Sequence, residues 1–533
     1  MEFAPLAEMI ADAILESDPG RALDAGDHRF DDRLPDFSAE GVSSDVGMLR
    51  DAALALSQVD ADALELADRV DHEILSGIVD RSIFELTEVR EHEWNPLAHN
   101  PGPFLYELLA RPFAPAAVRL DSLYHRVSAI PDALATAREV LRDCPEIHLE
   151  TAVGQFEGAA ALLREQVPGL LAQEPSMTGS VQPAVDRAAA ALTDFSGWLR
   201  EQTGGRDPRL GRKLWEARLW HTLDTELSAA AVLDRAEANL ARVMAEIRDA
   251  SAALIGGPPT DETVRTALAS LSAEHPDDAT IVALAETTLA ETTEFVRRND
   301  LVSLVDDPCV IEEMPEFARG VAGAYCSAPG PLETADVPTF YSISPTPAGW
   351  SAELVESYYR EYNNHMIRNL TVHEAMPGHF LQLAHGRRYR GSTRVRALGF
   401  SGVFVEGWAV YAEEIMADHG FGGLPVRLHQ LKMQLRMTIN AILDQLVHCE
   451  NLSEDEAMDM LVGRGFQERG EAAGKWRRSL LTSTQLSTYF VGWAEVSSIG
   501  RSRPAGVSLR QWHDAMLAQG SPSPRHLRTL LGI

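Results

Sequence analysis

The sequence predicts a mainly α-helical fold with a small β-sheet. Three long segments are rich in Ala, Leu, Glu and Arg and carry apolar residues at three- and four-residue spacing, namely 181–201, 213–255 and 277–298. Short Pro/Gly/Asp turns separate them at 204–208 and 256–260. This periodicity is typical of amphipathic helices that pack on one another.

The pattern changes after residue 300. Between Val302 and Ser344 the chain contains β-prone pieces at 309–313 and 339–344, separated by Pro and Gly, and helical patterns resume at Ala352. We therefore expect a small sheet beside the helix that follows. An edge strand of this sheet can pair with an extended peptide, although the pieces are equally compatible with simple connecting strands.

With 533 residues, the chain exceeds the usual length of one domain. We expect two lobes around a deep cleft, an N-terminal helical lobe over 1–300 and a catalytic lobe over 301–533, which can also form one intertwined unit. The four Cys are widely scattered and lack C-x-x-C spacing, so buried free thiols are the simplest interpretation.

Charge and composition restrict the partners and the compartment. The formal net charge of −32 argues against a nucleic-acid partner and against anionic membrane surfaces. The first residues form no basic, apolar leader, and no uncharged stretch reaches membrane-spanning length. We expect a cytoplasmic protein without a membrane partner. A homodimer is compatible with the sequence.

The most informative motif is His373-Glu374-Ala375-Met376-Pro377-Gly378-His379. In H-E-x-x-H motifs two His four residues apart share a helix face and bind Zn²⁺, but here the gap is six residues, and a regular helix would turn the two rings about 120° apart. Pro377 and Gly378 stand where a helix break would bring the rings back together. Alone, the motif is also compatible with a helix cap, a turn and an exposed His.

A third ligand is predicted downstream, in an apolar helix-prone segment interrupted by acids. Glu406 and Glu413 are seven residues apart and share one helix face. We assign Glu406 as the third ligand and expect Glu413 to orient a ligand imidazole. The alternative is a solvated acidic face or pairing with Arg side chains.

The segments 371–382 and 404–413 resemble the bacterial domain-of-unknown-function family 885, usually described as zinc metallopeptidases of the gluzincin type. Weaker likeness lies at 22–28 with 34–36, and near the end at 511–514 and 520–522. The resemblance implies a large helical metallopeptidase-like fold. The chain departs from the family at Phe380, where a second His is frequent, and at Asn440, where an Arg often precedes the Asp444/His448 element.

A further candidate is Tyr489, whose position resembles that of the oxyanion-stabilising Tyr in related helical gluzincins; an aromatic packed between helices is the alternative. Four further basic residues are candidates for binding a substrate carboxylate, and we assign this role to none of them: Lys475, Arg477, Arg478 and His513.

We predict a metallopeptidase-like hydrolase that cleaves peptide bonds in short peptides, as an exopeptidase. Zn²⁺ is bound by His373, His379 and Glu406, Glu374 is the general base, and Tyr489 shares the oxyanion. Mn²⁺ or Co²⁺ are open alternatives for the metal. Two other functions stay open: a metal-dependent amidase acting on small non-peptide amides, and a non-catalytic peptide-binding protein.

Overall fold

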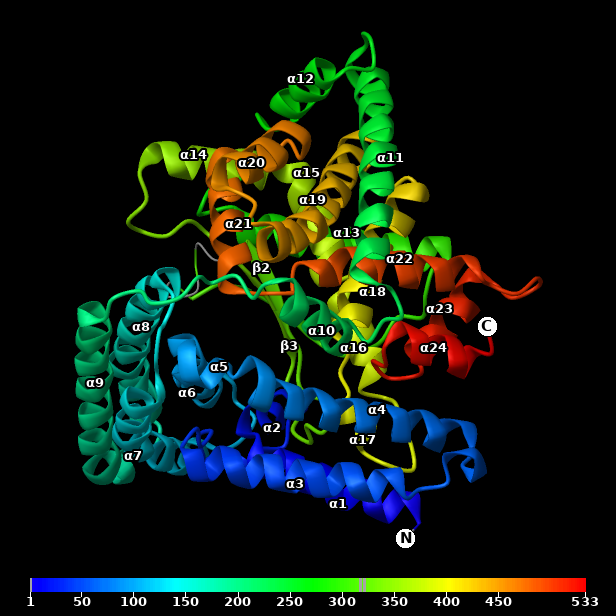
Figure 1. Cartoon of the computed structure of the whole chain (residues 1–533). Helices are drawn as coiled ribbons and strands as arrows, with labels where there is room; N and C mark the ends of the chain where they lie inside the picture. The colour runs from blue at the N-terminus through cyan, green and yellow to red at the C-terminus, as the bar shows by residue number, and fades with distance from the viewer. Residues whose placement is uncertain (1, 316–318, 320–322) are drawn as a thin grey trace. The chain divides into compact units, whose positions relative to one another are not determined.

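The computed structural model describes residues 2–315, 319 and 323–533 (Figure 1). The predicted fold class is confirmed, since helices dominate the chain and one three-stranded sheet occurs in its described part. Contacts between residues divide the chain into two compact units, Met1–Pro208 with Pro329–Val337 and Gly391–Gly399, and Arg209–Ala328 with Pro338–Arg390 and Phe400–Ile533. Each unit is described separately below.

The first unit is helical. Its helices are α1 (Phe3–Ser17), α2 (Pro19–Ala25), α3 (Ala39–Ser57), α4 (Leu66–Phe84), α5 (Glu91–Trp94), α6 (Gly102–Ala110), α7 (Ala116–Val140), α8 (Glu146–Leu171), α9 (Thr178–Glu201) and α17 (Val395–Leu398). Helices α7, α8 and α9 pack side by side and enclose an apolar core that includes Phe156 and Phe195 (Figure 1). The helix predicted at 181–201 corresponds to α9.

The family-like segment at 22–28 has a structural role in this unit. Gly26 ends α2 in the left-handed conformation, at φ 77°, and a side chain there would collide with Glu333. His28 then lies between two carboxylates, with Nδ1 2.8 Å from Asp31 and Nε2 2.7 Å from Glu333. The opening motif therefore attaches the distant segment 329–337 to α2.

The second unit contains the predicted metal-binding residues. Its helices are α10 (Arg212–Leu223), α11 (Ala229–Ile255), α12 (Asp261–Leu271), α13 (Ile281–Asn299), α14 (Ala352–Glu361), α15 (Asn364–Glu374), α16 (His379–Gly386), α18 (Gly402–Asp418), α19 (Gly423–Glu450), α20 (Glu454–Met458), α21 (Arg469–Leu481), α22 (Ser487–Arg501), α23 (Leu509–Leu517) and α24 (Pro524–Leu531). The boundary expected at residue 300 differs from the observed division, because α11 packs on α19 and α13 packs on α15.

The segment 213–255, which is helical as its composition predicts, forms two helices, α10 and α11. Asp224 ends α10 in the left-handed conformation at φ 45°, and the Ser228 hydroxyl accepts a hydrogen bond from the backbone N–H of Ala231 at the start of α11. Local capping thus interrupts an otherwise continuous helical pattern.

The sheet lies beside α15, as predicted. Its strands are β1 (Cys309–Glu313), β2 (Ala324–Ser327) and β3 (Thr339–Ile343), in the order β1-β3-β2, with β1 parallel and β2 antiparallel to β3. Strand β2 contacts α15, and the hydroxyls of Tyr341 and Thr371 are 3.2 Å apart. The central strand is thereby anchored to the helix that carries His373.

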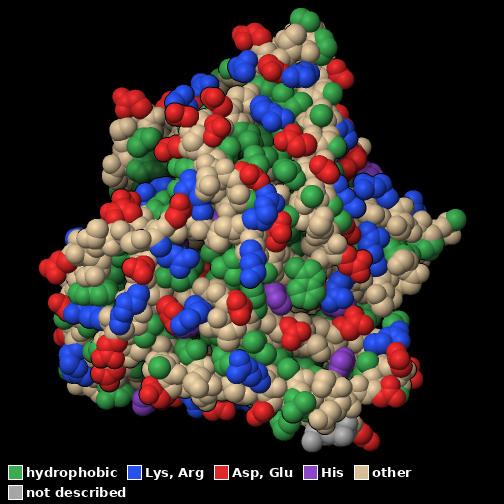
Figure 2. Space-filling model, viewed as in Figure 1, with side chains coloured by type: hydrophobic (Ala, Val, Ile, Leu, Met, Phe, Trp, Pro, Cys, Tyr) green, Lys and Arg blue, Asp and Glu red, His purple; other side chains and the backbone are tan. Residues whose placement is uncertain are grey.

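The surface shown in Figure 2 carries Lys and Arg side chains interspersed with Asp and Glu. Among the described helices, none combines the length and the apolar character required to cross a lipid bilayer.

Candidate metal centre

The two His of the central motif lie on different helices. Helix α15 ends at Glu374, and α16 begins at His379. Gly378 approaches the backbone carbonyls of Val372 and His373 so closely that no Cβ could be accommodated there. The indole N–H of Trp408 donates to the carbonyl of Pro377 at 2.8 Å and attaches this break to α18. The predicted helix break is confirmed.

The break brings the rings of His373 and His379 together. Their centroids are 4.7 Å apart and their planes are nearly perpendicular, at 86°. The Oε2 atom of Glu406 lies 3.5 Å from Nε2 of His373 and 3.6 Å from Nε2 of His379. The structure therefore places these three predicted ligands in one cluster, in which one donor atom from each residue lies within 4.8 Å of the other two.

These distances fit a metal site. Ligands 2.0–2.1 Å from a tetrahedral zinc are about 3.4 Å apart. Among the described residues, Oε2 of Glu406 is buried and has no hydrogen-bond partner, although two imidazole nitrogens lie close to it. A cation between the three atoms would satisfy this oxygen. The identity of that cation does not follow from the donor set.

Glu413 is hydrogen-bonded to the first of these imidazoles. Its Oε1 atom lies 2.7 Å from Nδ1 of His373, and its Oε2 accepts a 2.6 Å hydrogen bond from the Asn369 amide. A carboxylate at Nδ1 favours the tautomer in which Nε2 is free to bind a metal. Asn369 was not identified from the sequence, because its role depends on the packing of α15 against α18.

Burial and neighbouring charges determine the acidity of the cluster. Burial alone would raise the pKa of Glu406, but the adjacent imidazoles of His373 and His379 hold it well below its usual value. Burial raises the pKa of Glu374, and the carboxylates of Glu406 and Glu413 add to this rise against the opposing effect of the two His.

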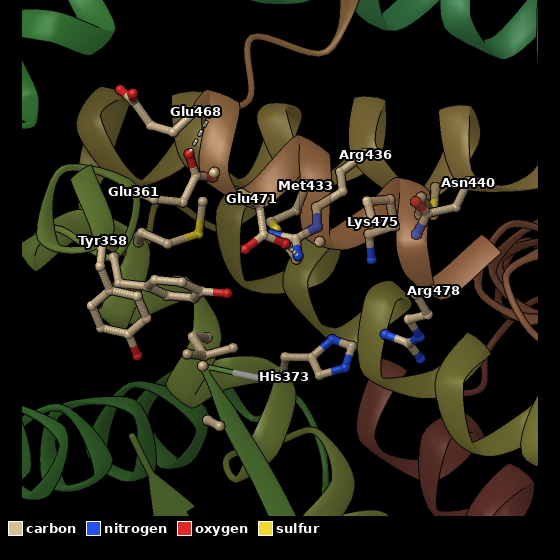
Figure 3. A pocket seen from close by; sticks show the side chains of 18 of the residues that line it. Tyr358, Glu361, His373, Met433, Arg436, Asn440, Glu468, Glu471, Lys475 and Arg478 are labelled. Atoms are coloured by element: carbon tan, nitrogen blue, oxygen red, sulfur yellow. Dashed lines mark hydrogen bonds and ion pairs between the residues drawn. The ribbon is translucent and has the colours of Figure 1, made fainter. Parts of the chain in front are cut away.

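A cavity of about 310 Å³ lies next to the cluster, within the second unit. Glu374 and Tyr489, from α15 and α22, line it. His373 lines it as well, together with three basic side chains, Arg436 from α19 and Lys475 and Arg478 from α21 (Figure 3). The hydroxyl of Tyr489 accepts a 3.2 Å hydrogen bond from Arg478, so its own proton is available to another acceptor.

Tyr489 is positioned by two features that the sequence did not reveal. Helices α18 and α22 meet at Gly407 and Gly492, where a Cβ on either residue would collide with the backbone of the other helix. Asp444 accepts hydrogen bonds from the backbone N–H groups of Thr484 and Ser487, at 3.0 and 3.1 Å, and so anchors the start of α22.

The remaining candidates lie elsewhere. His448 has its Nε2 3.0 Å from the carbonyls of Ser479 and Thr482, and His513 has its Nδ1 2.7 Å from the carbonyl of Leu301, so both are hydrogen-bonded in the interior. Arg477 is exposed and does not line the cavity.

The fold and the cluster define a mainly helical protein with a largely buried His-His-Glu set beside a cavity. The chain belongs to the family described as "Bacterial protein of unknown function (DUF885)", whose model matches residues 19–531. The suspected family is thus confirmed. Comparison with curated proteins gives no match.

Two similar solved structures cover nearly the whole chain. One is described as a "putative lipoprotein of unknown function from Shewanella oneidensis", with 27% identity, a TM-score of 0.83 and coverage of 100% of both chains. The other is a "putative lipoprotein from Colwellia psychrerythraea", with 15% identity, a TM-score of 0.81 and coverage of 99% of this chain and 98% of that one. An M32 carboxypeptidase from Deinococcus radiodurans R1 aligns over 99% of this chain and 96% of its own at 10% identity. Its TM-score of 0.40 is too low to support a conclusion about this chain.

These relatives contradict the expected cytoplasmic location, because both full-length matches are described as lipoproteins. The expectation rested on the first residues of the chain and on its lack of a membrane-length apolar stretch, and neither feature determines the compartment. The expectation of a cytoplasmic protein is therefore wrong.

Proposed function

We propose that this protein is a zinc-dependent hydrolase that cleaves peptide bonds in short peptides. The observation that carries this proposal is the convergence of two imidazole nitrogens on the buried, unpartnered Oε2 of Glu406. His373, His379 and Glu406 would hold the ion and leave a coordination position open, as in catalytic zinc sites. A zinc ion bound there supplies Lewis acidity, which polarises a carbonyl group and makes water more acidic.

Glu374 is assigned as the general base. It follows His373 directly in the chain and its side chain lines the same cavity. Its carboxylate takes a proton from the attacking water and returns it to the amine that leaves. Because it holds no place among the three metal ligands, its removal affects turnover and not metal binding.

Tyr489 is assigned as a donor to the oxyanion of the tetrahedral intermediate. Its hydroxyl accepts from Arg478, and the cationic donor polarises the O–H group toward a second acceptor. A hydroxyl donor that carries no charge of its own suits a charge that develops only in the transition state.

The size of the cavity supports a short substrate. Its volume of about 310 Å³ is at the lower end of the range for small-molecule sites. Gly323 and Ala324 at the start of β2 line its wall, and β2 is an edge strand, so an extended peptide can add main-chain hydrogen bonds there. A non-peptide amide would use the same metal chemistry but would not form main-chain hydrogen bonds with β2.

The test is hydrolysis of a panel of short peptides and small N-acyl amides by the zinc-loaded protein. We expect cleavage of peptides, loss of cleavage on chelation, and recovery when zinc is restored. Glu374→Gln should lower the rate by about 10²–10⁴-fold with its metal content unchanged. Cleavage restricted to non-peptide amides would favour the amidase, and a chelator-resistant rate would contradict the proposal.

A further inference from the structure

One wall of the cavity carries two basic side chains that have no carboxylate partner among the residues that the structure describes. Lys475 is only 5% exposed, and no hydrogen bond to its amino group occurs within the described part of the chain. Arg478, one turn further along α21, donates to the side-chain amide oxygen of Gln485 at 2.8 Å and to the Tyr489 hydroxyl at 3.2 Å, and neither partner is a carboxylate. Figure 3 shows both basic groups extending from α21 toward the side of the cavity where His373 lies.

The described acidic residues that line this cavity already have partners. Glu471 forms an ion pair with Arg436, and Glu361 accepts from Lys432 at 2.8 Å. Glu468 lies 3.6 Å from Arg360. Glu413 is held by the hydrogen bonds described above, and Glu374 lies at the metal end. Among the described residues, Lys475 and Arg478 are therefore left without a carboxylate to balance them.

Such an arrangement is costly without an anion. Burial, and then the charges of Arg436 and Arg478, lower the pKa of Lys475 well below its usual value, while Glu471 opposes this only weakly. A buried cation of this kind is stabilised when an anion enters and forms charge-assisted hydrogen bonds. The guanidinium fork of Arg478 and the amino group of Lys475 match the two oxygens of a carboxylate.

We propose that Lys475 and Arg478 bind a carboxylate of the substrate, at the end of the cavity beside α21. This proposal rests on the proposed function and deepens it. A peptide whose terminal α-carboxylate is held there keeps its C-terminal part inside the cavity that Glu374 lines, so the protein removes residues from the carboxyl end. A side-chain carboxylate of Asp or Glu offers the same chemistry, and the experiment separates these two sources.

The experiment compares three peptides of neutral residues that differ at the C-terminus: a free acid, its amide, and an amide whose last residue is Glu. Kinetic constants are measured for wild type, Lys475→Met and Arg478→Gln. Arg469→Gln removes an exposed charge from the same helix and is the matched control. Because Lys475→Met removes a buried charge, it should fold at least as stably as wild type.

We expect the free acid to be cleaved at least about 10²-fold more efficiently than the amide by wild type, through a lower KM. Lys475→Met should raise KM for the acid by about 10–100-fold, with kcat less affected and the amide nearly unchanged. Arg478→Gln should raise KM for the acid to a similar extent and should also lower kcat for both peptides, because Arg478 donates to the Tyr489 hydroxyl. The Arg469→Gln control should match wild type. Rescue by the Glu amide would identify the side-chain carboxylate as the group recognised, and its failure would identify the α-carboxylate.

Direct binding separates this proposal from the proposed function. Binding of the same peptides is measured by calorimetric titration into two proteins, the Glu374→Gln variant and the double variant Glu374→Gln/Lys475→Met. If acid and amide are cleaved equally well, the carboxylate site is wrong and the peptidase stands. If no peptide is cleaved, tighter binding of the acid that is lost in Lys475→Met still supports the site, and equal binding of acid and amide overturns it.

Discussion

Nδ1 of His373 lies 2.7 Å from Oε1 of Glu413, a residue that is 1% exposed. The other carboxylate oxygen accepts from Asn369, so both oxygens of Glu413 are used inside the protein. This contact sets the orientation of the imidazole and directs its Nε2 toward Glu406. The buried pair thus links the packing of α15 on α18 to the proposed metal site.

Glu413→Gln should weaken zinc binding. His373 and Asn369 address different oxygens of Glu413, and Gln replaces one of these oxygens with an NH2 donor, so one of the two contacts is lost. Loss of such a partner typically costs about 10–100-fold in metal affinity, which a competition titration with a chromophoric chelator measures. Asp418→Asn, an exposed change on the same helix, should leave the affinity unchanged. Equal affinities for wild type and Glu413→Gln would mean that the contact does not orient a ligand.

Gly492→Ala should destabilise the second unit. The added methyl group would collide with the carbonyl of Val403 and the backbone of Gly407 where α18 and α22 meet. Overpacking of this kind typically costs about 1–3 kcal/mol, and more when backbone must move. Chemical denaturation measures the change. Gly402→Ala, where a Cβ has ordinary contacts only, should be close to neutral, and a neutral Gly492→Ala would contradict the close helix approach.

Tyr489→Phe tests the assignment of the oxyanion donor. The variant keeps the ring and loses the hydroxyl, so kcat should fall by about 10²–10³-fold while zinc content is retained. Tyr325→Phe, at an intermediate-exposure position in β2, is a matched control outside the cavity lining. An unchanged kcat in Tyr489→Phe would support the alternative of a packing aromatic.

His28 predicts a pH-dependent stability of the first unit. Burial would lower its pKa, but hydrogen bonds and charges of Asp31 and Glu333 raise it from 6.5 to about 9. Because the folded state binds the proton more tightly, this contribution is fully present below pH 6.5 and is lost as the pH rises through about 9.

The measurement is the melting temperature of wild type and His28→Asn across this range. At pH 6 the wild type should melt at a higher temperature than His28→Asn, and this difference in melting temperature should shrink toward pH 10. His125→Asn, at an exposed position on α7, is the control. A difference independent of pH would show that the ion pairs do not stabilise the unit.

The helix break and the shared helix face of Glu406 and Glu413 were predictable because each is a local property of the chain. Pro377 and Gly378 interrupt a helix whatever surrounds them, and two acids seven residues apart on an apolar helix must share a face. The positions of β1 and β3 followed in the same way from their β-prone composition.

The cationic wall and the supports of Tyr489 were not predictable from local pattern. In the sequence, Lys475 and Arg478 are typical of an ordinary exposed helix face. Their position in the cavity wall results from the packing of α21 against α14 and α19. Asp444 and Ser487 are 43 residues apart and meet only in the folded chain. The attachment of 329–337 to the first unit likewise depends on contacts with α2 that no periodicity reveals.

The central claim is that His373, His379 and Glu406 bind one metal ion, and elemental analysis of the purified protein tests it most directly. Wild type should contain about one zinc per chain, and His373→Ala, His379→Ala and Glu406→Ala should each lose it, while the exposed-site control His125→Ala retains it. Absence of metal from wild type after incubation with zinc, or retention of zinc in His379→Ala, would contradict the account.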